Sequence, residues 1–230
     1  MLTLVGLGLR DGDIPVRGID ALEEADAAYA ELYTNTIDYD LAALGERTGT
    51  DITVLDRAAV EDEDRIVETA ADQDVVFLVS GDPLAATTHQ DLLFRARRRG
   101  LDVEVVHAPS ILTAVAQTGL SLYKFGRTTT LTIQNGAVPG SVFDAVRENQ
   151  AAGLHTLVLL DIGMTVDEAL PLLAAEVSGD VVVCDRVGTA DQQIAVGEID
   201  EIAADRFGTP AAVIVPGELS GNEQERLQHV

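Results

Sequence analysis

The stretch that decides the fold runs from residue 75 to residue 89 and reads VVFLVSGDPLAATTH. Its first five residues are all apolar, and a run of this length suits a strand that is buried on both faces. Gly81 and Pro83 then end the strand, because glycine adopts backbone angles that other residues avoid and proline donates no backbone hydrogen bond. Ligands of open α/β sheets bind beyond the carboxyl ends of the strands. The carboxylate of Asp82 therefore stands where a ligand is expected, although a plain strand-to-helix turn has the same pattern.

A second strand and loop of this kind follow at residues 103–111, which read VEVVHAPSI. Pro109 biases the residue before it away from helical angles. Ser110 can cap a helix that begins directly after it. The sequence thus places a strand before a small-residue loop and a helix twice, which favours an α/β architecture.

Strand-like and helix-like segments alternate along the rest of the chain. Strands are expected at residues 2–7, 52–55, 75–79, 103–106, 129–133, 156–160, 181–184, 194–196 and 212–215. Helices are expected at residues 16–27, 41–47, 61–71, 90–99, 110–117, 141–150, 166–177 and 199–206. The periodicity is interrupted near residues 112–127. We therefore expect two α/β domains, at residues 1–112 and 113–230, with a cleft between them and a loose polar tail from Glu218 onward.

The composition bounds the class of protein. With 230 residues, of which 47% are hydrophobic, the chain can bury a core and is not disordered. No apolar run approaches the roughly 20 residues of a membrane span. The first residues also lack the pattern of a secretory signal, so we expect a cytoplasmic protein without a membrane partner. Cys184 is the single cysteine, which excludes an internal disulfide, and it is expected to be buried.

The formal net charge is −24, because 39 acidic residues outnumber 15 lysines and arginines. Such a surface opposes binding to nucleic acid. Mutual repulsion at this density destabilises a fold in dilute buffer, and salt screens that repulsion. The composition resembles that of proteins from halophilic archaea. No cluster of His and Cys has the spacing of a zinc site, and we expect no metal.

Six segments together carry a resemblance to a known family: residues 6–9, 30–34, 81–89, 107–111, 119–128 and 153–162. They cover nearly the whole chain in family order, and by them the chain resembles the diphthine synthases within the tetrapyrrole-methylase-like superfamily. The Gly-Asp-Pro segment at residues 81–83 indicates only the superfamily. The segments at residues 123–128 and 154–156 point to the diphthine synthases. The glycine-rich loop of Rossmann-type methyltransferases is absent, which agrees with this resemblance.

The resemblance implies a methyltransferase that binds S-adenosylmethionine in the cleft between the two domains. The family's binding positions fall on Leu9, Asp82, Ala85, Ser110, Ile111, Leu160, Val187 and Ala211. The implied acceptor is the amino group of a 3-carboxy-3-aminopropyl histidine on translation elongation factor 2, which receives three methyl groups to become diphthine in diphthamide biosynthesis. The resemblance also implies a homodimer. The cofactor supplies the electrophile and the protein supplies orientation. The sequence identifies no general base and no other catalytic residue.

For four polar side chains the sequence allows both a structural role and contact with a ligand or substrate. Lys124 and Arg127 either attract the carboxylate of the acceptor or have structural roles. His89 either stands at a helix terminus or faces a substrate. Asp161 either caps a turn or meets a ligand.

Two alternative functions share part of the sequence pattern. A tetrapyrrole methylase acting on a corrinoid or porphyrinoid would share the Gly-Asp-Pro segment but would not need the segment at residues 123–128. A noncatalytic regulator would bind adenosylmethionine without releasing its demethylated product.

Overall fold

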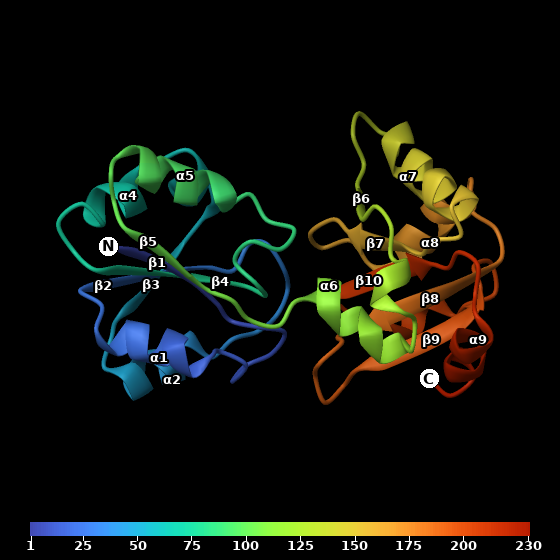
Figure 1. Cartoon of the computed structure of the whole chain (residues 1–230), viewed down its shortest axis with the longest axis horizontal. Coiled ribbons are helices and arrows are strands. Elements are labelled where there is room, and N and C mark those ends of the chain that lie inside the picture. Colours follow the sequence, from blue (N-terminus) through green and yellow to red (C-terminus); the bar gives the residue numbers. More distant parts are fainter. The chain divides into compact units, whose positions relative to one another are not determined.

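The structure is a computed structural model, and it describes the backbone of residues 1–230 and every side chain except that of residue 205. The chain forms two compact units, Met1–Ile111 and Leu112–Val230 (Figure 1). Each unit combines helices with its own five-stranded sheet. This architecture confirms the predicted α/β fold class. The predicted cleft and the predicted domain bounds, residues 1–112 and 113–230, stay predictions.

The first unit is built on a parallel sheet with the strand order β3-β2-β4-β1-β5. The strands are β1 (Leu2–Gly6), β2 (Ala27–Glu31), β3 (Ile52–Leu55), β4 (Val75–Val79) and β5 (Val103–Val106). Every residue of β1 and β4 is buried, as the apolar run at residues 75–79 predicts. The register pairs Gly6 with Val79, so the carboxyl ends of these two central strands are level.

Helices cover both faces of this sheet. The helices α1 (Val16–Glu23) and α2 (Leu41–Thr48) lie on one face, and α4 (Arg65–Thr69) and α5 (Gln90–Arg98) lie on the other (Figure 1). The short helix α3 (Arg57–Glu61) precedes α4. Alternate residues of a strand point to opposite faces. Leu4 of β1 accordingly packs in one apolar cluster with Leu92 of α5, and Val5 packs in another with Leu22 of α1.

The second unit has a mixed sheet with the strand order β6-β7-β10-β8-β9, in which only the β6–β7 pair is parallel. The strands are β6 (Thr129–Leu131), β7 (Thr156–Leu160), β8 (Asp180–Asp185), β9 (Gln193–Glu198) and β10 (Ala211–Val215). The helix α6 (Ile111–Ala114) begins at the last residue of the first unit, and the other helices of the second unit are α7 (Gly140–Ala151), α8 (Val166–Ala174) and α9 (Gly221–Leu227). Short 3₁₀ turns occur at η1 (Val115–Thr118), η2 (Leu122–Lys124) and η3 (Ala204–Arg206).

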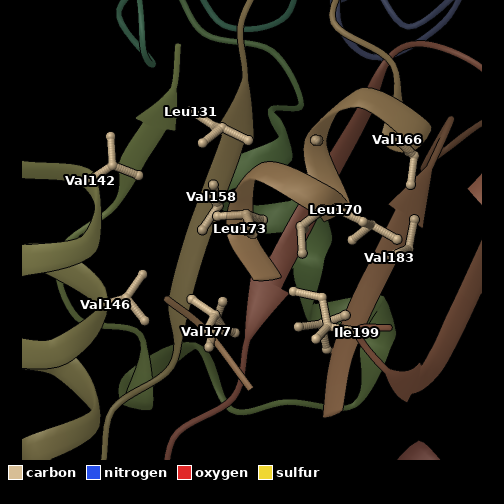
Figure 2. Close-up of a cluster of buried hydrophobic side chains, with 14 of the residues drawn as sticks. Leu131, Val142, Val146, Val158, Val166, Leu170, Leu173, Val177, Val183 and Ile199 are labelled. Carbon is tan, nitrogen blue, oxygen red and sulfur yellow. The ribbon is translucent and has the colours of Figure 1, made fainter. Parts of the chain in front are cut away.

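An apolar core joins the helices α7 and α8 to this sheet (Figure 2). Val158 and Val183 of the sheet are fully buried in it together with Leu173 of α8. Cys184 is also buried, as the sequence predicts, and its burial raises the pKa of the thiol to about 12. This cysteine is therefore a small apolar residue of the sheet and is not a nucleophile.

The structure differs from the sequence-based expectation in five segments. The predicted helix at residues 110–117 is divided into α6 and η1. The predicted helix at residues 16–27 ends at Glu23, and the alanine-rich segment that follows is the strand β2, which was not expected. The predicted helix at residues 61–71 is broken between α3 and α4 at three acidic residues. The predicted helix at residues 199–206 is a turn followed by η3. The tail beyond Glu218 contains the capped helix α9.

No helix in the described part of the chain combines the length and the apolar character needed to cross a membrane.

Candidate functional site

The loops that leave β1 and β4 are joined to each other at the carboxyl edge of the first sheet. Gly8 and Gly81 form a pair of backbone hydrogen bonds of 3.1 and 3.0 Å. Both glycines have positive φ angles, of 82° and 69°, which side chains other than glycine rarely tolerate. A Cβ atom on Gly6 would lie 2.5 Å from the carbonyl oxygen of Gly81 and 2.6 Å from the Cβ of Ala108. The glycines therefore let three loops approach one another closely at this edge.

The carboxylate of Asp82 ties two of these loops together. Its Oδ1 accepts a hydrogen bond from the backbone N–H of Leu84 at 2.9 Å. Its Oδ2 accepts one from the N–H of Ala108 at 3.2 Å and lies 2.8 Å from Nδ1 of His107. Its backbone carbonyl accepts a hydrogen bond from the N–H of Ala85. Asp82 thus orders its own loop and fixes that loop against the one that follows β5.

The loop that carries Ala85 is tight and locally strained. Ala86 has a φ of 56°, which is uncommon for a residue with a Cβ atom and costs conformational energy. The hydroxyl of Thr87 donates a hydrogen bond to the carbonyl of Pro83 at 3.0 Å, and Thr88 donates one to Glu61 at 2.9 Å. These two hydrogen bonds connect the loop to itself and to α3.

His89 ends this loop as a core residue and not as a substrate contact. Only 1% of the residue is exposed, and its ring packs edge-on against Phe77 and Tyr33. It occupies the N-cap position of α5. Burial lowers the pKa of His89 to about 4, so the imidazole is neutral at physiological pH. Of its two interpretations, the helix-terminal one agrees with the structure.

The five site residues predicted in the first unit all follow the carboxyl ends of adjacent strands. Leu9 follows β1, and its N–H donates a hydrogen bond to Asp13 at 3.2 Å. Asp82 and Ala85 follow β4, whereas Ser110 and Ile111 follow β5. The strand order places β1 between β4 and β5. The structure therefore brings these positions to one edge of the first sheet.

The three site residues predicted in the second unit gather at one edge of the second sheet. Leu160 ends β7, and Ala211 begins the neighbouring antiparallel strand β10, whose register pairs Ala212 with Leu159. On the other side of β10, Ala211 pairs with Asp185, the last residue of β8. Val187 lies two residues further on.

An ion pair that the sequence reasoning missed stands at this second edge. The carboxylate of Asp185 is fully buried and accepts hydrogen bonds from Arg186, with Nε at 3.1 and 3.2 Å and Nη2 at 2.9 Å. The hydrogen bonds to Asp185 raise the pKa of Arg186 above its ordinary value. An acidic residue followed by an arginine at the end of an apolar strand was the available signal.

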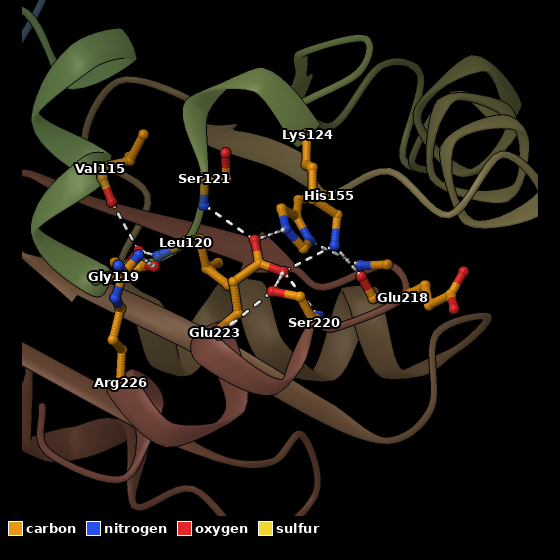
Figure 3. Close-up of polar contacts among 12 residues, drawn as sticks. Val115, Gly119, Leu120, Ser121, Lys124, His155, Glu218, Ser220, Glu223 and Arg226 are labelled. Carbon is orange, nitrogen blue, oxygen red and sulfur yellow. Dashed lines mark hydrogen bonds and ion pairs between the residues drawn. The ribbon is translucent and has the colours of Figure 1, made fainter.

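At the opposite end of β7, Glu223 of α9 is the centre of a buried polar network (Figure 3). Its carboxylate lies 2.7 Å from Nζ of Lys124 and 3.0 Å from Nε2 of His155. It also accepts hydrogen bonds from the backbone N–H groups of Ser121 and Ser220. Nδ1 of His155 accepts a hydrogen bond from Gly217 at 3.0 Å, which places the ring proton on Nε2. The ion pair with Glu223 agrees with the structural interpretation of Lys124.

Two further side chains with open interpretations also have protein partners. Arg127 is exposed and forms an ion pair with Glu148 at 3.2 Å. Asp161 accepts hydrogen bonds from the hydroxyl of Thr132 at 2.6 Å and from the N–H of Ile162 at 2.9 Å, so it caps the turn after β7. Among the described side chains, no three His, Cys, Asp or Glu are grouped as ligands of a metal ion.

Comparisons with known proteins agree with the fold and with the family that the sequence resembles. Residues 1–203 match the family of Tetrapyrrole (Corrin/Porphyrin) Methylases. A diphthine synthase of Halobacterium salinarum is 42% identical over 252 residues, covering 100% of this chain and 97% of the relative. A diphthine synthase of Methanococcus maripaludis is 38% identical over 251 residues, covering 100% of this chain and 98% of that protein. A crystal structure of a diphthine synthase superimposes with a TM-score of 0.92 at 32% identity, covering 99% of this chain and 94% of that one.

Proposed function

The chain belongs to the tetrapyrrole methylase family and, within it, to the diphthine synthases, and from this premise we propose its acceptor, its product and its cofactor site. The protein is an S-adenosylmethionine-dependent methyltransferase of diphthamide biosynthesis. Its proposed acceptor is the amino group of a 3-carboxy-3-aminopropyl histidine on translation elongation factor 2. The proposed product is diphthine, which carries three methyl groups on that nitrogen.

The proposed cofactor site consists of Leu9, Asp82, Ala85, Ser110, Ile111, Leu160, Val187 and Ala211. The observation that carries this proposal is their placement, because all eight positions fall on two strand edges, five on the first sheet and three on the second. A Cβ atom on Gly81 would meet no other atom within 4 Å, so the backbone is open to close approach at that point. Loops of small residues at strand ends are typical of such sites.

The contribution of the chain to the chemistry is orientation. When bound, adenosylmethionine supplies an electrophilic methyl group on its sulfonium. Asp82 joins two loops of the first sheet through hydrogen bonds, and we propose that these bonds position the loop with Ala85 and Ala86 for the cofactor. Holding two reacting atoms about 3–3.5 Å apart and in line can account for much of the rate enhancement. The acceptor amine attacks with its lone pair after losing its proton.

We further propose that the chain acts in the cytoplasm as a homodimer that binds neither nucleic acid nor membrane. The net charge of −24 supports the second part of this proposal, because phosphate backbones and anionic lipids repel such a surface. Light scattering in molar potassium chloride measures the assembly, and a particle with the mass of a single chain would contradict the dimer.

The experiment that tests the acceptor measures formation of S-adenosylhomocysteine with matched acceptors. The protein is incubated in molar potassium chloride with elongation factor 2 that carries the aminocarboxypropyl histidine, with the unmodified factor, or with a corrinoid precursor. We expect product only with the modified factor. Product with the corrinoid alone would instead identify a tetrapyrrole methylase. No product with any acceptor, despite binding of the cofactor, would identify a noncatalytic protein.

A further inference from the structure

The guanidinium of Arg186 lies at the edge of the second sheet, and not all of its hydrogen-bond donors bind protein groups. Its Nε and Nη2 bind the buried carboxylate of Asp185, whereas Nη1 makes no hydrogen bond to any described residue. The side chain is 30% exposed. An arginine offers five N–H donors in a planar fork, so one side of the group can bind Asp185 while the other faces outward.

The backbone holds this arginine in an unusual conformation. Arg186 has a φ of 46°, in the left-handed region that residues with side chains rarely occupy. Its N–H donates a hydrogen bond to Pro210 at 2.9 Å, and its carbonyl accepts one from the hydroxyl of Thr189 at 2.8 Å. A Cβ atom on residue 208 would lie 3.3 Å from Nε, so Gly208 leaves room for the guanidinium. Strain of this kind persists where the surrounding structure enforces it, often at functional sites.

Neutralising Asp185 does not by itself explain this arrangement. A buried carboxylate needs one cation, and Nε and Nη2 already provide it. The strained backbone and the outward side of the fork are not required for that purpose. Arg186 is also adjacent to two proposed cofactor residues: it directly precedes Val187, and its N–H donates a hydrogen bond to the carbonyl of Pro210, directly before Ala211. In a chain with a net charge of −24, a cation held at this edge gives an anionic group a local partner.

We propose that Arg186 binds the carboxylate of an amino-acid group at this edge, an inference that rests on the proposed function. Both reactants carry such a group: the methionyl part of adenosylmethionine and the 3-carboxy-3-aminopropyl part of the acceptor. A guanidinium binds carboxylates through two parallel hydrogen bonds and leaves the amine free. The carboxylate is also the part of the acceptor that stays unchanged through successive methylations, so one contact serves every step.

The test compares Arg186→Lys with the control Arg147→Lys in the full chain. Lysine at position 186 still neutralises Asp185 but loses the fork. Arg147 is an exposed arginine of α7 that binds Asp144 and Glu176, and it lies outside the proposed site. A second variant, Asp185→Asn combined with Arg186→Gln, removes both charges together and leaves no buried carboxylate without a partner. Melting temperatures establish that each variant is folded.

Two readouts separate the two sources of the carboxylate. Calorimetry with S-adenosylhomocysteine alone measures binding of the cofactor part, and the KM for modified elongation factor 2 measures binding of the acceptor. Loss of one charge-assisted contact is expected to weaken binding about 10- to 100-fold. A weaker calorimetric affinity in both Arg186 variants assigns the contact to the cofactor. A raised KM for the factor with unchanged calorimetry assigns it to the acceptor.

If both quantities match those of the wild type and of Arg147→Lys, the inference is wrong and Arg186 only neutralises Asp185. The activity of the wild type distinguishes failure of this inference from failure of the proposed function. An active wild type with unaffected variants overturns the role of Arg186 alone, whereas a wild type that does not methylate the factor overturns the proposed function.

Discussion

At the scale of the residue, Asp82 is the member of the proposed site that the sequence pattern predicts most directly. Its place after an apolar strand and a glycine predicts a carboxylate near a ligand, and the structure adds that this carboxylate joins two loops. The pattern could not predict that second role, because the partner loop is 26 residues away in the sequence. Arg186 was missed for a related reason, since its importance depends on a backbone angle and on the burial of Asp185.

The change Asp82→Ala is expected to lower stability and weaken cofactor binding together. It removes the acceptor of two backbone hydrogen bonds and the partner of His107, which we expect to lower the free energy of unfolding by about 2 kcal/mol. Denaturant unfolding and calorimetry with S-adenosylhomocysteine measure the two effects. The control Asp40→Ala removes only the cap of α2 and should cost about 1 kcal/mol without changing cofactor affinity. Unchanged affinity in Asp82→Ala would remove this residue from the site.

His89 is expected to make the fold sensitive to mild acid. Its pKa is lowered from 6.5 to about 4 in the folded protein, so the unfolded chain binds more protons between these values. The stability that the neutral ring provides is therefore complete above pH 6.5 and falls as the pH drops toward 4, by up to about 1.4 kcal/mol per pH unit. Denaturant unfolding at pH 7 and pH 5 measures this loss. His89→Leu should reduce it and His229→Gln should not. An equal loss in the wild type and in His89→Leu would assign it to other groups.

At the scale of the element, apolar runs predict the strands that are buried on both faces, and helical periodicity predicts the helices that bury one apolar face. They fail where burial overrides local preference. The segment AAYAE of β2 has the composition of a helix, yet it forms a strand because it fits between β3 and β4. The polar sequence of α9 predicts a loose tail. Its local pattern does not indicate that Glu223 forms hydrogen bonds with Ser121 and Lys124, about a hundred residues earlier in the chain.

Glu223→Gln is expected to loosen α9 from the rest of the second unit. Burial opposes the charge of this carboxylate, but the hydrogen bonds from Lys124, Ser121, Ser220 and His155 outweigh burial and hold the pKa of Glu223 well below its ordinary value. The stability this provides is present above about pH 4.5 and is lost as the pH falls further. We expect the substitution to cost about 2–3 kcal/mol at neutral pH. Denaturant unfolding compares it with Glu225→Gln, an exposed change on the same helix. Equal midpoints for the two variants would contradict this role.

At the scale of the whole molecule, the net charge of −24 decides the conditions under which the fold is stable. The ion pairs seen in the structure are mostly between exposed groups, which contribute little individually. We therefore expect long-range repulsion among the remaining carboxylates to be the larger electrostatic effect. Composition alone predicts this property, since it does not depend on which residues touch.

The melting temperature is expected to rise as potassium chloride is increased from low to molar concentration. Screening reduces the repulsion between carboxylates, because the Debye length falls from roughly 30 Å at 0.01 M salt to roughly 3 Å at 1 M. Circular dichroism melts measure the effect. Sucrose at low salt is the control, because it stabilises proteins by being excluded from their surface and does not screen charge. A melting temperature that does not depend on salt would show that repulsion does not limit this fold.

The measurement that tests the central claim most directly is peptide mass spectrometry of elongation factor 2 over a time course with the protein and adenosylmethionine. An amine keeps its lone pair after one or two methylations, whereas a quaternary ammonium has none and ends the reaction. We predict a final gain of three methyl groups, all on the nitrogen of the aminocarboxypropyl histidine, and no gain on the unmodified factor. Methylation of the unmodified factor, or of another residue, would contradict the proposed acceptor. A reaction that stops at one methyl group would contradict the proposed product.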